Sequence, residues 1–173
     1  MAGRRSLIAL TAGLFAVAPL STLALEFPDA DRQLIPYIDN RSTPQDVLTS
    51  FYNAINTGQF PRAYGYYASD YAPKDFDAWV KGYTSTVRVR LVTGSALPSP
   101  GAGQIYWSVP LAIEATLSDG SKRVYGGCYQ LHMANPGMIT APPYSPIAMQ
   151  KGKLEPSDKP LEQAVPEKCG PVL

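Results

Sequence analysis

Few side chains in this 173-residue chain could carry acid–base chemistry, because it has a single histidine, His132. General acid–base catalysis would need a carboxylate beside it, and Asp70, at the end of an expected helix, is the acid considered for that pair. A buried His–acid pair would suit a lyase or isomerase without a cofactor. Because the chain contains neither a Ser–His–Asp order nor a Gly-rich phosphate loop, the sequence favours a protein that is not an enzyme.

The two cysteines, Cys128 and Cys169, bear on metal binding and on redox state. Together with one histidine they are too few for the usual zinc or iron–sulfur sites, so no metal and no cofactor are expected. In an oxidising compartment they are most simply joined in one disulfide, with two free thiols as the alternative. The bond would close a loop of about 40 residues and hold down a polar, Pro-rich tail over 154–173.

Tyrosine is the most abundant polar aromatic residue, with eleven copies concentrated in the expected helices. Tyr52, Tyr67 and Tyr83 are candidate ligand contacts, because a cluster of phenols facing a cavity can bind a small apolar or aromatic ligand and orient its polar groups. The alternative is that their rings simply cover a sheet.

The first 24 residues predict a secretory signal peptide. Arg4 and Arg5 precede an apolar stretch over 7–20, and small residues place the cleavage site after Ala24. We therefore expect a periplasmic or secreted bacterial protein with no stable membrane anchor after cleavage. An uncleaved anchor and a twin-arginine signal are the alternatives. Without the two signal arginines, 13 basic residues face 14 acidic ones, a balance that excludes general attraction to nucleic acid.

The rest of the chain predicts helices first and an antiparallel sheet second, which defines an α+β domain. After a lead-in over 25–42, a capped helix runs from Pro44 to Gly58, and further helices are expected over 61–69 and from Pro73. Apolar alternation then predicts strands over 87–91, 105–117, 122–133 and 147–150. We place the domain at 43–153, between the lead-in and the tail.

Several of these stretches resemble a known family. The segment TPQDVLTSFYNAINTG over 43–58 is similar to the opening helix of nuclear transport factor 2-like (SnoaL-like) domains. Residues 78–83 followed by 87–89, and residues 124–131, are similar to exported bacterial members of that superfamily. The resemblance implies three N-terminal helices packed on a curved, cone-like antiparallel sheet that encloses a cavity. It implies no activity, because isomerases, cyclases and non-catalytic binding modules share the fold.

The Asp119-Gly120 pair predicts a hairpin turn between the two longest strands. If the turn has two residues, Cys128 opposes Leu111, Gln130 opposes Val109, and His132 opposes Trp107. Trp107, Gln130 and His132 would then lie on the apolar face as ligand-binding residues. Alternatively, Gln130 and His132 bond to loops at the strand end, and a bulge at the two glycines before Cys128 would reverse the facing.

Three functions are compatible with these residues. The first is an exported, non-catalytic module of the nuclear transport factor 2-like fold that binds a small ligand or a protein. The second is the cofactor-free lyase or isomerase with a pocket pair of His132 and Asp70. The third is an accessory protein of the cell envelope whose tail contacts an envelope partner.

Overall fold

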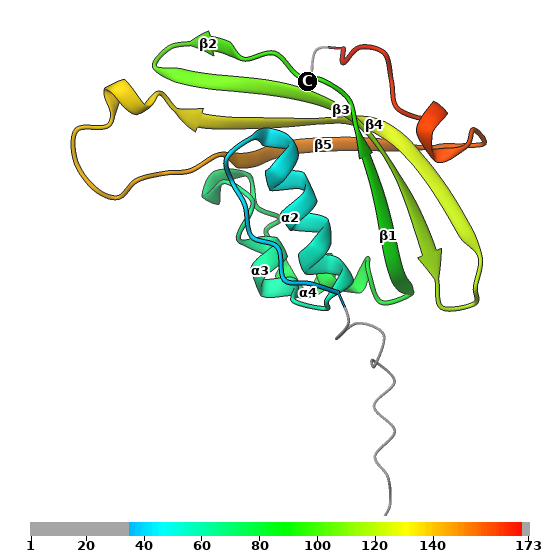
Figure 1. Cartoon of the computed structure of the whole chain (residues 1–173). Coiled ribbons are helices and arrows are strands. Elements are labelled where there is room, and N and C mark those ends of the chain that lie inside the picture. The colour runs from blue at the N-terminus through cyan, green and yellow to red at the C-terminus, as the bar shows by residue number, and fades with distance from the viewer. Residues whose placement is uncertain (1–34, 171–173) are drawn as a thin grey trace, which may run out of the picture.

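The computed structural model describes residues 35–170 (Figure 1). The predicted signal peptide and most of the lead-in lie outside the described residues. Within them, no helix is long and apolar enough to cross a membrane. The elements are, in chain order, α2 (Pro44–Asn56), α3 (Phe60–Tyr64), the 3-10 turn η1 (Ser69–Tyr71), α4 (Phe76–Lys81), β1 (Thr86–Thr93), β2 (Ser99–Gly101), β3 (Gln104–Leu117), β4 (Lys122–Ala134), η2 (Pro136–Met138), β5 (Ala148–Ser157) and η3 (Leu161–Gln163).

Helix α2 is the central helix and begins as its sequence predicts. Thr43 caps it by accepting a bond from the Asp46 backbone N–H, and Pro44 occupies the first turn. Its apolar residues are fully buried and form most of the helical part of the core; they include Val47, Leu48 and Phe51. The predicted second helix is shorter than expected, because α3 ends at Tyr64 and Asp70 lies in η1.

The strands form one antiparallel sheet in the order β1-β3-β4-β5, with the short β2 paired to β3. The sheet is strongly curved, and the three helices lie against its concave face (Figure 1). Val109, Leu111 and Leu131 are fully buried between the sheet and α2. This α+β arrangement of helices on a curved antiparallel sheet is consistent with the fold that the family resemblance of the sequence implies.

The hairpin between β3 and β4 corrects the predicted register. Its turn has three residues, because Leu117 pairs with Ser121 through a 2.9 Å bond and Gly120 adopts a positive φ of 80°. Facing residues therefore shift by one, so that Cys128 opposes Pro110, Gln130 opposes Ser108 and His132 opposes Tyr106. The pairing of β3 with β4 runs without a bulge.

The one-residue shift exchanges the two faces of β4. Tyr125, Tyr129 and Leu131 point to the helices with Val109 and Ile113. The even-numbered residues, among them Cys128, Gln130 and His132, belong to the outer face. The prediction that Trp107, Gln130 and His132 share one face was therefore wrong, since Trp107 opposes Leu131 on the inner face.

The tail crosses the outer face of the sheet, on the side opposite the helices (Figure 1). The predicted disulfide is confirmed: Cys128 and Cys169 are bonded, with their Cα atoms 5.8 Å apart. Strand β5 is longer than the predicted 147–150 and pairs with β4 as far as Ser157. Beyond it, Leu161 and Ala164 pack on Ala112 in a second, smaller apolar cluster.

Candidate functional site

Four tyrosines approach one another between the helices and the concave face of the sheet, and we call them the tyrosine cluster: Tyr52, Tyr67, Tyr83 and Tyr129. They come from four separate places in the chain. Tyr52 is on α2, Tyr83 follows α4, and Tyr129 is on β4. Tyr67 is held against β5 because the backbone on either side of it bonds to Met149, at 2.8 Å in both directions.

The phenol hydroxyls of Tyr52 and Tyr129 form the centre of this cluster. Their oxygens lie 3.1 Å apart, a hydrogen bond in which either hydroxyl can donate. Gly152, the β5 residue opposite Tyr129, leaves room for the Tyr129 ring, because a Cβ at that position would lie 2.0 Å from the ring. A glycine in the edge strand therefore sets the position of a cluster tyrosine.

Burial governs the ionisation of these phenols. It raises the pKa of Tyr52, Tyr67, Tyr83 and Tyr129 above the ordinary value of 10.0, mainly because the charged phenolate would lose its hydration. The neighbouring phenols raise the pKa of Tyr52, Tyr67 and Tyr83 further. All four side chains are therefore neutral hydrogen-bond donors at physiological pH.

A cavity of about 270 Å³ opens beside three members of the cluster, Tyr52, Tyr83 and Tyr129. Its remaining wall combines Ile113, Tyr125 and Leu154 from the sheet with the hydroxyl residues Ser85 and Thr86. The exposed side chain of Arg123 also lines it. The volume is just below the range of about 300–1,000 Å³ that is usual for drug-sized ligands, and therefore suits a molecule with one ring.

The Tyr52–Tyr129 hydroxyl pair can donate a further hydrogen bond into this cavity. In the Tyr52–Tyr129 pair one hydroxyl donates to the other, so the second proton remains free for another acceptor. The cluster can therefore bind a carbonyl, hydroxyl or carboxylate oxygen of a ligand.

Three of the ligand contacts predicted from the sequence, Tyr52, Tyr67 and Tyr83, are brought together in this cluster. The sequence reasoning missed Tyr129 and Tyr125, which the predicted register placed on the outer face. A signal for them was present, since the odd-numbered positions of β4 from Tyr125 to Met133 are more apolar than the even ones. Trp107 packs at the margin of the inner core.

His132 and Asp70 line a different depression, of about 390 Å³, near the start of β5. His132 Nδ1 lies 3.2 Å from Gln104 Oε1, and its ring contacts Tyr71 and Tyr106 with centroids 6.2 and 6.1 Å away. Burial lowers the pKa of this imidazole, which favours its neutral form. The bonding partner of His132 is thus an amide.

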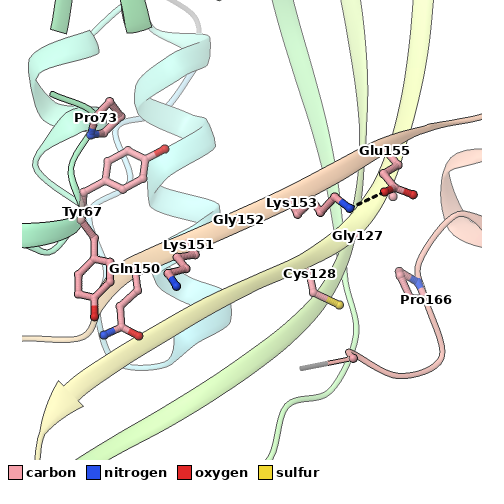
Figure 2. Close-up of a pocket in the computed structure, with 13 residues that line it drawn as sticks. Tyr67, Pro73, Gly127, Cys128, Gln150, Lys151, Gly152, Lys153, Glu155 and Pro166 are labelled. Atoms are coloured by element: carbon pink, nitrogen blue, oxygen red, sulfur yellow. Dashed lines mark ion pairs between the residues drawn. The ribbon is translucent and has the colours of Figure 1, made fainter. Parts of the chain in front are cut away.

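A larger hollow, of about 770 Å³, follows strand β5 and the adjoining part of β4 (Figure 2). Glycine backbone and long side chains form much of it, including Lys151 and a Lys153–Glu155 ion pair of 2.9 Å. Figure 2 shows its lining residues spread along the strand rather than converging on one point. The hollow is therefore an elongated surface along the edge strand, with charged side chains in its lining.

Other charged groups serve the structure. On the outer face Glu114 forms ion pairs with Lys122 at 3.1 Å and with Arg90 at 3.4 Å. These cations lower the pKa of the Glu114 carboxyl. Within residues 35–170, no group of three or more His, Cys, Asp or Glu side chains could hold a metal ion.

Comparisons with known proteins concern the fold alone. No protein-family model matches the sequence, and no curated protein matches it. Among solved structures, the chain is similar to a scytalone dehydratase-like protein from Novosphingobium aromaticivorans, with 9% identity, a TM-score of 0.46, and coverage of 65% of this chain and 80% of that one. It is also similar to a protein assigned as the beta subunit of an aromatic-ring-hydroxylating dioxygenase from the same organism, with 11% identity, a TM-score of 0.47, and coverage of 69% and 90%. A nuclear transport factor 2-like protein of unknown function from Exiguobacterium has 12% identity, a TM-score of 0.40, and coverage of 65% and 99%.

Proposed function

We propose that the protein is an exported, non-catalytic module that binds a small ligand in the cavity beside the tyrosine cluster. The observation that carries this proposal is the convergence of neutral phenol donors on a cavity whose wall combines polar groups with apolar side chains. Apolar walls supply affinity, and a few fixed donors supply orientation. The raised pKa values keep the phenols protonated, which suits them to hold a ligand rather than to accept a proton from it.

The disulfide supports the exported location. Bonds of this kind persist in the bacterial periplasm and outside cells, and are rare in the reducing cytosol. The Cys128–Cys169 bond also holds the tail against the sheet, where Leu161 is buried. We therefore propose that the chain is exported and folds in an oxidising compartment, where this disulfide can form.

A cofactor-free lyase or isomerase at His132 is the second candidate. The observation in its favour is that His132 and Asp70 line one depression and that Gln104 fixes one nitrogen of the ring. If Gln104 accepts from Nδ1–H, then Nε2 carries the lone pair and can accept a proton. This arrangement would need a substrate that lies between Nε2 and Asp70.

A search for a co-purified ligand distinguishes the two candidates. The mature protein would be purified from the periplasm under mild conditions, and mass spectrometry would be done on the intact complex and on its denatured extract. We expect a small molecule that the wild type and Tyr106→Phe retain and that the Tyr52→Phe/Tyr129→Phe double variant loses. Tyr106 is the matched control because its ring lies on the outer face beside His132.

The opposite pattern would contradict the proposal. A ligand retained by the double variant but lost in His132→Gln would favour the second candidate. If no ligand co-purifies, one-ring aromatic probes titrated into the same variants by NMR give the same comparison.

A further inference from the structure

We propose that the ligand of the tyrosine cluster is a one-ring carboxylate, with its ring in the cavity and its anionic group at Arg123. This inference rests on the proposed function and adds the chemical class of the ligand. It follows from the size of the cavity, from its polar lining, and from the position of the Arg123 side chain.

The charged part of the lining is a guanidinium. Arg123 lines the same cavity as Tyr52, Tyr83 and Tyr129, and it is exposed to solvent. Its partner in the β3–β4 pairing is Ala115, a buried residue of the inner face. Arg123 therefore lies near the hairpin end of the concave face, where a ligand would meet solvent.

The neighbouring acids are already engaged elsewhere. Glu114 is on the outer face, where Lys122 and Arg90 pair with it. The Asp119 carboxylate accepts bonds from the Ser121 backbone N–H at 2.9 Å and from its hydroxyl at 2.6 Å, within the turn. The Ser121 hydrogen bonds lower the pKa of Asp119, and Arg123 lowers it slightly further through space. Among the described residues, however, no carboxylate lies within 4.0 Å of the Arg123 guanidinium.

The rest of the lining points to the same class of ligand. Ser85 and Thr86 line the cavity together with the phenols, so hydroxyl groups and one cation are its polar side chains. Phenols and guanidinium groups donate to carboxylate oxygens, and a guanidinium adds charge to that bond. A neutral ring with the same shape would use the apolar walls and the phenols but would gain nothing from Arg123.

The experiment compares benzoate with benzamide, which has nearly the same shape but no charge. Both would be titrated by NMR into the mature protein at low salt, using wild type, Arg123→Gln and Arg88→Gln. Arg88 is the matched control, since it is an exposed arginine of β1 outside the cavity lining. We expect the wild type and Arg88→Gln to prefer benzoate by about two- to fivefold, as is usual for a solvent-exposed charge pair.

In Arg123→Gln the preference should disappear because benzoate binding weakens while benzamide binding is unchanged. Added salt should reduce the preference in the wild type by screening. Equal binding of both probes to the wild type, or a preference that persists in Arg123→Gln, would overturn the inference and leave the proposed binding function standing. If neither probe binds, or if Tyr52→Phe/Tyr129→Phe binds both unchanged, the proposed function itself fails together with the inference.

Discussion

The two faces of the sheet are formed by the same strands but are covered by different parts of the chain. On the outer face, small apolar side chains such as Ala112 and Val124 are covered by the chain's own tail, which brings Leu161 and Ala164 into contact with them. On the inner face, the helices cover most of the sheet but leave phenol hydroxyls beside a cavity of about 270 Å³. Around Ala112 and Val124 the outer face is covered by apolar packing, whereas the inner face keeps donors that a ligand can satisfy.

Because of this difference, substitutions on the two faces should differ in their effects on stability and on ligand binding. The tail approaches the sheet so closely that a Cβ at Gly126 would lie 2.1 Å from the Ala164 carbonyl oxygen. Such contacts are part of the packing of the tail on the sheet, so substitutions there should act on unfolding. The inner face combines both properties, because Tyr52 is buried in the core and also lines the cavity. Substitutions in the tyrosine cluster should therefore change both ligand binding and stability.

Removing the disulfide should have the largest effect, and it should be confined to the outer face. In Cys128→Ser/Cys169→Ser the free energy of unfolding should fall by about 2–4 kcal/mol, because the unfolded chain regains the freedom of the closed loop. Urea unfolding followed by circular dichroism measures this loss, and wild type in reducing agent should reproduce it. Binding of benzamide at low temperature should be unchanged; a loss of binding would show that the two faces are coupled.

Gly152→Ala tests the inner face through the position of Tyr129. The added methyl group would collide with the Tyr129 ring, so we expect a loss of about 1–3 kcal/mol in stability and weaker probe binding. Gly101→Ala is the matched control, because a Cβ there meets nothing within 4 Å. Thermal unfolding and NMR titration would be run on both variants. If Gly152→Ala binds probes as well as wild type does, the Tyr129 ring is not part of the binding surface.

The hydrogen bond between Tyr52 and Tyr129 should contribute less to stability. Tyr52→Phe should lower the free energy of unfolding by about 1 kcal/mol, since it leaves the Tyr129 hydroxyl without that partner. A double-mutant cycle with Tyr129→Phe, measured by urea unfolding, isolates the pair: the double variant should lose less than the sum of the single losses. Additive losses would show that the two hydroxyls do not interact in solution.

The smallest effect is expected at Glu114, on the outer face. Lys122 and Arg90 lower its pKa below the ordinary value of 4.5, so the ionised form contributes stability above that pH. The contribution should be lost as the pH falls through the lowered pKa of the folded state. Glu114→Gln should therefore unfold more easily than wild type at neutral pH, with the difference vanishing in acid. Exposed Glu167→Gln is the control, and an equal difference at every pH would contradict the assignment.

Much of the fold could be predicted because its signals are local. A capping threonine followed by proline begins α2, and the change of apolar period from helical to alternating separates the helices from the sheet. The Cys128–Cys169 bond could be predicted from the number of cysteines and the expected compartment. The gathering of Tyr52, Tyr67 and Tyr83 was a weaker prediction, since nothing local determines where three helical segments converge.

The tertiary structure decided which residues of β4 point to the helices. The physical reason is the length of the β3–β4 turn, which has one residue more than predicted. Asp119-Gly120 is compatible with two- and three-residue turns, and the alternation of a strand converts that single-residue difference into an exchange of its two faces. The burial of Tyr129 and Leu131 against α2 favours the three-residue turn. The sequence by itself determined the elements, their order and the disulfide between the two cysteines. Only packing decided that Tyr129 joins the phenols of the inner face while His132 lies on the outer face, because the burial of a side chain depends on residues far apart in the chain.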